Sequence, residues 1–391
     1  MQTPIASETT VKAIADLAEQ AGLEHVHMLG WRDLDDDEGG GSEIHAHNIA
    51  SIWTQAGVRV TMRTSKAPGL PATRVRDGYT VSRKGGRYDV FLRSPLAELS
   101  GRLGPCDGLV EIWNGMPFWS PLWWRGPRTI WLHHVHGPMW GQTLPAPAAK
   151  VGVTLEERIA PKIYRHQPIV TLSPSSRDEL VGDLGFDDDK VSVITPGVDP
   201  FFSPGGDRSP TPLAVAVGRL TPVKDFPRLV RIMARVHERV PDAELVIVGE
   251  GYERERIQTT IDDLGAAGYI RLAGRVDDEA LRDLYRRAWT ATSASTREGW
   301  GMTLTEAAAC GTPSVASDIS GHADAIAAGR SGLLGGTDDE LVGLLVEVLT
   351  DEARRTTLQA GALARAAELT WEHAAQANFE VLAADALRRR R

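Results

Sequence analysis

Apolar and polar residues follow one another along this chain in two repeating patterns. Short apolar runs, typical of buried strands, are followed by longer amphipathic stretches, typical of helices that cover a parallel sheet. The first half predicts helices at residues 42–56, after a run of glycines, and at residues 176–184, after a serine-rich capping stretch. Its apolar runs predict strands at residues 25–29, 59–61, 108–112, 129–132 and 169–172.

The same pattern restarts in the second half. It predicts strands at residues 213–217, 243–248, 270–272, 291–293 and 314–316, and helices at residues 226–239, 252–264, 278–286 and 371–391. Residues 199–212, between the halves, are rich in proline, glycine and serine and lack periodicity, which marks them as a linker. The pattern therefore predicts an α/β protein of two doubly wound, Rossmann-like domains that bind ligands at the carboxyl ends of their strands.

The length of 391 residues is typical of two domains. We place the first domain at residues 1–203 and the second at residues 204–370, and we expect the helix at residues 371–391 to pack back toward the first domain.

Composition narrows the class of protein. The formal net charge of −9, from 43 basic and 52 acidic residues, argues against a general nucleic-acid binder. Two cysteines, Cys106 and Cys310, are too few for a disulfide framework, or for a zinc site by themselves. The start of the chain lacks the apolar core of a signal peptide, and no run reaches the length of a membrane span. We therefore expect a cytoplasmic protein.

Two carboxylates of the second half carry the strongest chemical signal, in the segment Glu298-Gly299-Trp300-Gly301-Met302-Thr303-Leu304-Thr305-Glu306. The glycines let the loop approach a ligand, and the helix that follows offers unpaired N–H groups and a dipole that favour phosphate. Glu306 is expected about two turns into this helix, on the side of its start, where it can accept hydrogen bonds from ligand hydroxyls. The alternative is a strand–loop–helix corner with solvated carboxylates.

Three further segments follow predicted strands. Arg219 and Lys224, five residues apart in one loop, can flank a diphosphate, unless both are merely solvated. Residues 246–251 (VIVGEG) lead from a strand into a glycine turn, which alone is a weak dinucleotide-type signal. Residues 272–276 (LAGRV) either present main chain to a flat base or form a plain βα turn.

Together, these four segments resemble the nucleotide-sugar domain of the retaining glycosyltransferases of family 4, whose Glu-x7-Glu spacing is their most specific mark. The resemblance is clear over residues 214–330 and weaker over residues 39–57, residues 196–199 and the region of Trp371. It implies the GT-B fold, with two Rossmann-like domains facing across a cleft. One departure is His322, which stands where many members have a glycine.

The resemblance also implies a role for each matched residue. Arg219 and Lys224 would bind the donor diphosphate, and Glu298 the hydroxyls of the transferred sugar. Glu306 would bind the ribose. The donor-binding residues implied in this way are Gly40, Gly41, Arg219, Lys224, Gly274, Arg275, Val276, Glu298, Gly299, Trp300, Gly301, Met302, Thr303, Leu304 and Glu306. The expected catalytic residues are Glu298, His133, Arg219 and Lys224.

The first domain would then bind the acceptor. His133, at the end of a predicted strand, is the first choice for a histidine near the reacting sugar, with His134 and His136 as alternatives. Each can instead be a structural histidine. Trp123 and Trp124, among six tryptophans between residues 113 and 140, are candidates for stacking on the acceptor or for hydrophobic packing.

Two charged runs have simpler interpretations. The acids of residues 35–38 are predicted to form a solvated loop rather than a metal site, or to attract a cationic or polyhydroxylated acceptor. The arginines of residues 388–391 complement a helix dipole, and weak contact with anionic lipid is the alternative.

The expected activity is that of a hexosyltransferase-type enzyme. It would move a sugar from a UDP or GDP sugar to a hydroxyl acceptor with retention of configuration, without a metal or another cofactor. The acceptor can be a small metabolite, a natural product, a lipid or a glycan. The alternatives are an epimerase or phosphorylase on the same fold, and a non-catalytic partner that binds sugar nucleotides.

Overall fold

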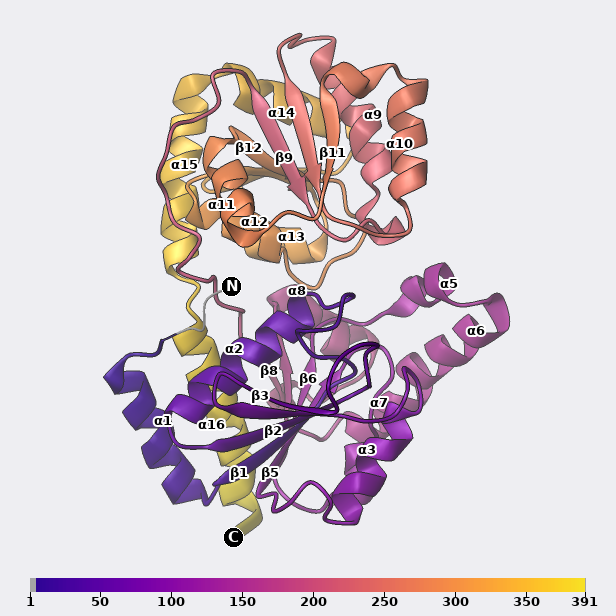
Figure 1. Cartoon of the computed structure of the whole chain (residues 1–391), viewed down its shortest axis with the longest axis vertical. Helices are drawn as coiled ribbons and strands as arrows, with labels where there is room; N and C mark the ends of the chain where they lie inside the picture. Colours follow the sequence, from indigo (N-terminus) through magenta and orange to yellow (C-terminus); the bar gives the residue numbers. More distant parts are fainter. Residues whose placement is uncertain (1–4, 391) are drawn as a thin grey trace. The chain divides into compact units, whose positions relative to one another are not determined.

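The computed structural model describes residues 5–390, and the side chains of all of these except residues 138, 142 and 143. The chain forms two compact units (Figure 1). Of the described residues, the N-terminal unit comprises 5–197 and 370–390, and the C-terminal unit comprises 198–369. The expected boundary after residue 203 lies inside the C-terminal unit, because Arg286 Nε donates a hydrogen bond to the carbonyl of Ser203 (2.7 Å).

In the described part of the N-terminal unit, eight strands form one sheet in the order β3-β4-β2-β1-β5-β6-β7-β8. The strands are β1 (His25–Leu29), β2 (Arg59–Thr64), β3 (Thr73–Arg76), β4 (Tyr79–Arg83), β5 (Gly108–Trp113), β6 (Arg128–Leu132), β7 (Ile169–Thr171) and β8 (Val191–Val193). Neighbours are parallel except β3 and β4, an antiparallel hairpin that the sequence analysis did not predict. Asp77 and Gly78 form its turn, and both have positive φ (44° and 89°), as a tight hairpin turn requires.

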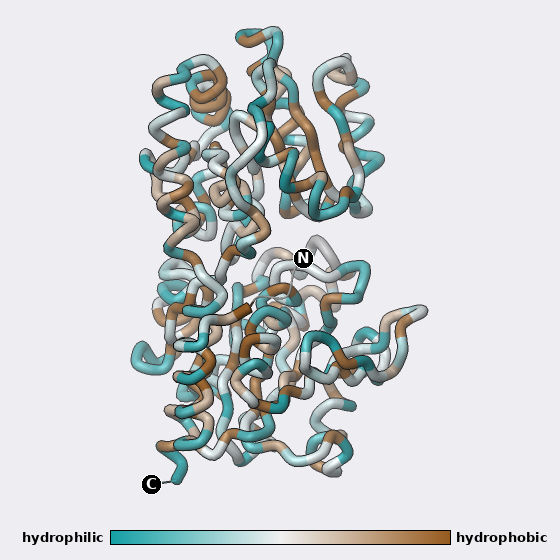
Figure 2. Tube along the Cα trace, turned by 60° about the vertical axis from the view of Figure 1, so that its left-hand side comes forward, coloured by the Kyte–Doolittle hydropathy of each residue, from teal (hydrophilic) through white to brown (hydrophobic). Residues whose placement is uncertain are grey.

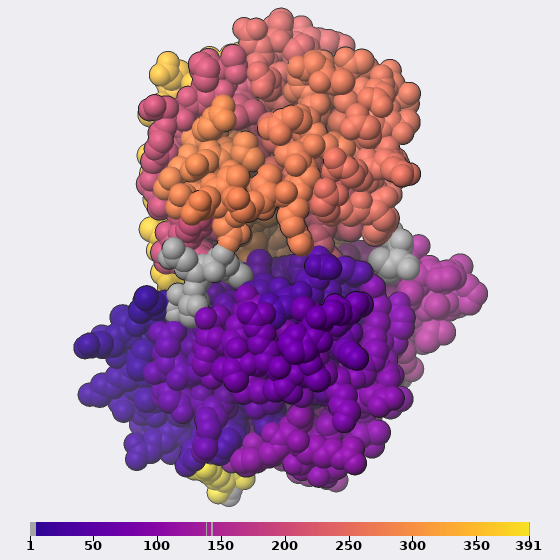
Figure 3. Space-filling view, in the orientation of Figure 1, coloured from indigo at the N-terminus to yellow at the C-terminus, as the bar shows by residue number. Residues whose placement is uncertain are grey.

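The helices of this unit are α1 (Glu8–Ala21), α2 (Gly41–Gln55), α3 (Val90–Leu99), α4 (Ser120–Trp123), α5 (Trp140–Thr143), α6 (Ala146–Thr154), α7 (Ala160–Tyr164), α8 (Pro174–Asp178) and α16 (Trp371–Arg390). Helix α8 begins earlier than predicted, because proline is tolerated in a first helical turn and the Ser173 hydroxyl caps it. Helices α5 and α6 project from the body of the unit (Figures 1 and 3).

Helix α16 lies against the N-terminal unit. The indole N–H of Trp53 donates to the carbonyl of Ala375 (2.9 Å), and the Trp53 ring packs edge-on against Phe379. Arg388 and Arg389 both form ion pairs with Asp385, and Arg390 donates to the carbonyl of Gln20. The described arginines at this end therefore have partners within the protein, whereas residue 391 lies outside the described residues.

The C-terminal unit contains a parallel sheet in the order β11-β10-β9-β12-β13-β14. Its strands are β9 (Leu213–Val217), β10 (Glu244–Val248), β11 (Ile270–Gly274), β12 (Thr290–Ser293), β13 (Ser314–Ser317) and β14 (Gly332–Gly335). Its helices are α9 (Phe226–His237), α10 (Arg254–Asp263), α11 (Asp278–Arg287), α12 (Met302–Ala309), α13 (Ser320–Ala325), α14 (Asp338–Thr350) and α15 (Glu352–Ala367).

Apolar residues cover both faces of this sheet. One buried cluster joins the strands to α9, α10 and α14, and another joins them to α11 and α12. The apolar character of the strands is visible along the chain trace (Figure 2). Within residues 5–390, none of the helices combines the length and the apolar character that crossing a membrane requires.

Candidate functional site

The predicted donor residues of the C-terminal unit gather at the carboxyl edge of its sheet. Strand β9 has β10 on one side and β12 on the other, so the connections after β9 and β12 diverge at this point of the sheet. Such a switch point is where doubly wound sheets bind ligands. Arg219 and Lys224 follow β9, and Glu298 follows β12. The topology therefore brings both predicted cations and the first carboxylate to one position.

Lys224 and Glu298 form an ion pair across this switch point. Lys224 Nζ lies 2.5 Å from Glu298 Oε1, and the hydroxyl of Ser295 donates to the same oxygen (2.8 Å). Burial, the largest single influence, raises the pKa of Glu298, but the charge of Lys224 and the hydrogen bonds from Lys224 and Ser295 act against it, and the pKa lies below its usual value. Glu298 is therefore ionised, and the cation beside it is held in a fixed position.

The start of α12 lies directly after this carboxylate. Gly301 precedes the helix, and Trp300 is buried with 4% of its surface exposed. Among the residues that the structure describes, no carbonyl accepts a hydrogen bond from the N–H of Met302 or Thr303. The helix therefore presents main-chain donors and the positive end of its dipole, which suits an anionic group.

The glycines after β10 serve close packing between loops. A Cβ on Gly249 would lie 2.0 Å from the carbonyl oxygen of Gly218, and Gly249 has a φ of +139°. A Cβ on Gly251 would lie 2.3 Å from the carbonyl oxygen of Leu220. This turn therefore supports the loop that carries Arg219 and Lys224, and its glycines are explained without a direct phosphate contact.

His322 lies beside Glu298, although it was noted in the sequence only as a departure from the family pattern. The main chain at Gly321 contacts that of Glu298 so closely that a Cβ on Gly321 would lie 2.3 Å from the Glu298 carbonyl oxygen. His322 is 1% exposed, and its Nδ1 lies 2.9 Å from the carbonyl of Ser317, which makes Nδ1 the donor. Burial lowers the pKa of His322, so the ring is neutral.

Glu306 lies in the second turn of α12 and accepts a hydrogen bond from the Tyr285 hydroxyl (3.1 Å). Burial raises the pKa of Glu306 to about 7, with a further contribution from the charge of Asp199. Tyr285 was not among the predicted site residues, because its position on the apolar face of α11 is typical of a core residue. Asp199 was included only as the last residue of the weak match at residues 196–199.

The raised pKa of Glu306 predicts a pH-dependent stability. The folded protein holds this proton up to about pH 7, whereas the unfolded chain releases it near the ordinary value of 4.5. The resulting stabilisation is complete below about pH 4.5 and is lost as the pH rises through 7, a change of at most about 3 kcal/mol. Denaturant unfolding at pH 5 and pH 7.5 should therefore show a steeper loss for the wild type than for Glu306→Gln; equal losses would contradict the assignment.

The other predicted donor residues have different environments. Arg219 is exposed, and its positive charge counteracts the rise that burial causes in the pKa of Tyr252. Gly274, at the end of β11, has a φ of +73°, and its carbonyl accepts from the N–H of Gly249 (2.9 Å). Arg275 is exposed, and Val276 packs against the core cluster of α11 and α12. Residues 272–276, which were predicted to contact the nucleotide base, therefore lie next to the glycine turn that follows β10.

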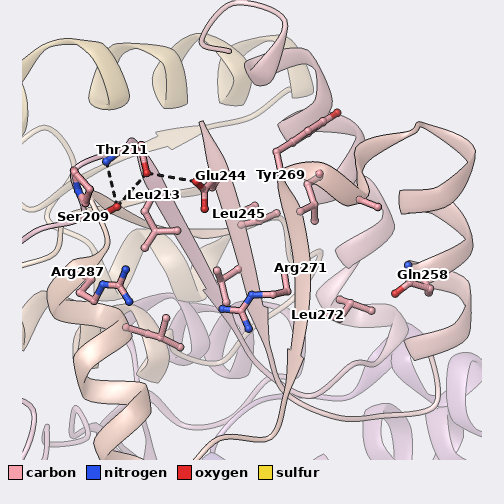
Figure 4. Close-up of a pocket in the computed structure, with 16 residues that line it drawn as sticks. Ser209, Thr211, Leu213, Glu244, Leu245, Gln258, Tyr269, Arg271, Leu272 and Arg287 are labelled. Atoms are coloured by element: carbon pink, nitrogen blue, oxygen red, sulfur yellow. Dashed lines mark hydrogen bonds between the residues drawn. The ribbon is translucent and has the colours of Figure 1, made fainter. Parts of the chain in front are cut away.

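A hollow of about 510 Å³ lies elsewhere in the C-terminal unit (Figure 4). It is lined by the first residues of β9, β10 and β11, among them Leu213, Glu244 and Arg271. Arg271 and Arg287 enter it from β11 and α11. Because these are the amino ends of the strands, the hollow lies at the opposite edge of the sheet from Lys224 and Glu298.

In the N-terminal unit, Gly40 and Gly41 lie at the start of α2, the helix that follows β1. Gly40 precedes the helix, and its N–H donates to the Glu43 carboxylate (2.8 Å). Ser42 accepts a hydrogen bond from the side-chain amide of Asn114, which follows β5 (3.2 Å). Strand β5 is the other neighbour of β1. The glycine loop therefore lies at the switch point of its own sheet.

The three candidate histidines have distinct environments after β6. His133 is 5% exposed, and its ring packs edge-on against His45 with centroids 4.7 Å apart. Burial lowers the pKa of His133 well below its usual value, so this ring is neutral. His134 and His136 stack on each other on the more exposed side. Neighbouring histidines thus point in opposite directions.

Glu156, which the sequence analysis did not select, organises the loop of these histidines. Its carboxylate accepts hydrogen bonds from the N–H groups of His136 (2.8 Å) and Gly137 (2.9 Å) and from the indole of Trp140 (2.9 Å). The side chain is 1% exposed and belongs to a π-helical turn between α6 and α7.

Replacement of Glu156 by alanine should destabilise the N-terminal unit, because three buried donors lose their acceptor. We expect a loss on the order of 3–5 kcal/mol in chemical denaturation. Glu156→Gln keeps one acceptor oxygen and should lose less. The exposed neighbour Glu157 provides the matched control, and its alanine variant should unfold like the wild type. A Glu156→Ala protein of wild-type stability would show that the carboxylate does not hold this loop.

Trp124 follows α4 and lies near the amino end of β6, whereas ligands of such sheets bind at the carboxyl ends of the strands. Its indole N–H donates to the carbonyl of Pro127 (3.0 Å), and its own carbonyl accepts from Arg128, the first residue of β6. The indole of Trp123 donates to the carbonyl of Phe118 (2.8 Å). Both rings pack around Leu109 and its neighbours, which favours hydrophobic packing over stacking on an acceptor.

The acidic run at residues 35–38 is solvated only in part, because Asp37 and Glu38 are exposed whereas Asp35 is not. Asp35 forms ion pairs with Arg74, Arg76 and Arg83, and its side chain is 13% exposed. These arginines lower the pKa of Asp35 although burial would raise it. Glu38 likewise forms ion pairs with arginines. Asp35 therefore anchors the hairpin β3–β4 to the loop after β1.

Two family matches cover most of the chain. Residues 201–365 match the family described as Glycosyl transferases group 1, and residues 39–201 match the one described as Glycosyltransferase Family 4. The chain belongs to the family 4 glycosyltransferases. The glycosyltransferase matches D-inositol 3-phosphate glycosyltransferases of Stackebrandtia nassauensis (35% identity over 57% of this chain and 55% of that protein) and of Segniliparus rotundus (26% over 89% and 85%). It thus spans about half the length of the first relative.

Solved structures confirm the fold of this glycosyltransferase. A sucrose-phosphate synthase from Thermosynechococcus elongatus superposes with a TM-score of 0.77 and 20% identity, over 91% of this chain and 98% of that one. Anabaena Alr3699/HepE, solved in complex with UDP and glucose, gives a TM-score of 0.72 and 17% identity over 92% and 100%. The predicted GT-B class, with two Rossmann-like units, is confirmed.

Proposed function

We propose that this glycosyltransferase transfers a hexose from a nucleoside-diphosphate sugar to a hydroxyl acceptor with retention of configuration and without a metal ion. The observation that carries the proposal is the Lys224–Glu298 ion pair at the switch point, directly before the start of α12. A diphosphate and a sugar bound at this point would meet a cation, main-chain donors and an ionised carboxylate.

Departure of the nucleoside diphosphate places negative charge on its oxygens. Lys224, Arg219 and the N–H groups at the start of α12 are the groups that would stabilise this charge, and fixed donors of this kind are effective because they need no reorganisation. These cations would also take the place of a divalent metal. Glu298 would accept hydrogen bonds from sugar hydroxyls while its charge favours a cation-like sugar.

Glu306 would bind the ribose. Ribose hydroxyls donate to an ionised carboxylate, so binding of the donor should lower the pKa of Glu306 from about 7. The ion pair with Lys224 makes Glu298 a poor nucleophile, so we propose that no covalent sugar–enzyme intermediate forms on this carboxylate. The acceptor hydroxyl would then attack from the side of the leaving group, with a phosphate oxygen as base.

The proposal is tested with the purified full chain and a panel of UDP and GDP sugars. D-inositol 3-phosphate heads the acceptor panel, because relatives carry it in their names. We expect release of nucleoside diphosphate that depends on an acceptor and survives chelation of divalent metals, and a product with the donor's anomeric configuration. Isomerisation of the donor alone would indicate an epimerase, and formation of a sugar phosphate would indicate a phosphorylase. Binding without turnover would indicate a non-catalytic partner.

A further inference from the structure

Three side chains with metal-binding atoms converge in the N-terminal unit, away from the glycine loop and the histidines of the proposed transfer reaction. They are His27 in the middle of β1, Glu98 near the end of α3, and Cys106 in the loop before β5. His27 Nδ1 lies 2.9 Å from both carboxylate oxygens of Glu98, and the Cys106 Sγ lies within 4.8 Å of the other ligand atoms.

The donor set and its burial are suited to zinc. One imidazole nitrogen, one carboxylate oxygen and one thiolate are ligands that zinc accepts in a tetrahedral site, at about 2.0–2.3 Å from the metal. Ligand atoms at these bond lengths are roughly 3.5 Å apart, so a small rotation of the Cys106 side chain completes the geometry. His27 is 2% exposed, and the Glu98 side chain is also 2% exposed. The site is therefore largely buried, with Cys106 partly exposed.

A hydrogen-bonded His–Glu pair beside an unrelated thiol is the simpler interpretation. It leaves two features unexplained. The pair turns both carboxylate oxygens toward a single ring nitrogen, and the thiol, which donates to the carbonyl of Gly108 (3.3 Å), is held within 4.8 Å of that pair. Arg63 is a buried cation close enough to Glu98 for their charges to interact. It does not take the place of a metal ion, because its guanidinium already donates to the carbonyls of Ser82 and Lys84.

We propose that His27, Glu98 and Cys106 bind one zinc ion that fastens the end of α3 to β1 and to the loop before β5. A water molecule would complete the coordination. The metal would displace the His27–Glu98 hydrogen bond and the thiol proton, so that β1, α3 and the loop before β5 become fixed to one another. The role is structural and independent of the proposed transfer reaction.

Cobalt(II) alone is the probe, because a cobalt–thiolate bond gives a charge-transfer absorption that nitrogen and oxygen ligands do not give. The chain has two cysteines, so Cys106→Ala and the matched control Cys310→Ala identify the thiolate. We expect one equivalent of cobalt to produce the band, zinc to abolish it, and Cys310→Ala to keep it. Cys106→Ala should lose it, and Glu98→Gln, nearly isosteric and expected to fold, should weaken binding on the order of 100-fold.

Zinc alone should also raise the thermal midpoint of the wild type, but not that of Cys106→Ala. A wild-type protein without the charge-transfer band overturns the proposal, as does a band that persists in Cys106→Ala. Unchanged affinity in Glu98→Gln would remove the carboxylate from the site and would equally reject the three-ligand assignment.

Discussion

Replacement of Lys224 by alanine is expected to lower kcat of sugar transfer by about 10²–10³-fold. This is the usual effect of removing one fixed group that stabilises a developing negative charge. The amine lies 2.5 Å from Glu298 at the switch point, so the substitution removes a positioned cation and leaves a buried carboxylate without its partner. The measurement is steady-state transfer with the donor found in the panel. Lys224→Arg should recover only part of the rate, because a planar guanidinium does not replace a compact ammonium group.

Arg239 is the matched control, an exposed cation just beyond the far end of α9, and Arg239→Ala should retain wild-type rates. The coupling to Glu298 is measured by a double-mutant cycle. If both residues act on the same transition state, Glu298→Gln should cost less in the Lys224→Ala background than in the wild type. A Lys224→Ala enzyme within about threefold of the wild type would remove the central assignment of the proposed function.

Replacement of Gly249 by alanine should destabilise the C-terminal unit more than the other single substitutions described for it. The added Cβ would lie 2.0 Å from the Gly218 carbonyl oxygen, and a φ of +139° is unfavourable for any side chain. Overpacking and backbone strain together predict a loss of about 3 kcal/mol or more in the free energy of unfolding. Chemical denaturation of the full chain measures it, read from probes in the C-terminal unit.

Gly343 supplies the opposite control. It lies on the exposed side of α14, and a Cβ there meets no atom within 4 Å. Gly343→Ala should therefore stabilise the protein by about 0.5–1 kcal/mol, the usual difference in helix propensity. If Gly249→Ala were as stable as Gly343→Ala, the contact between the β9 and β10 loops would not constrain the fold.

The sequence predicted most of the buried strands, because each of them is an apolar run, and it placed the candidates of the C-terminal unit after such runs. Arg219, Lys224 and Glu298 could be assigned to strand ends before the order of the strands was known. Their pairing could not be predicted, because it depends on β12 lying next to β9, and the two partners are 74 residues apart.

Other features were missed for physical reasons of the same kind. Asp35 was predicted to be solvated because its arginine partners follow 39 to 48 residues later, on a hairpin that was not predicted. Glu156 lies in a helical stretch, and the sequence pattern there does not distinguish a buried glutamate from an exposed one. Its significance comes from the loop that it holds, which periodicity does not show.

The two crossings of the chain between the units have a consequence for biosynthesis. The C-terminal unit is one uninterrupted stretch whose ends meet, with the N–H of Val198 donating to the carbonyl of Leu369 (3.0 Å), whereas α16 belongs to the N-terminal unit. A ribosome therefore completes the later-made unit before the earlier one can close its core around Phe379. Until that moment the nascent sheet exposes the apolar surface that α16 will cover, and this is the interval in which a chaperone would be needed.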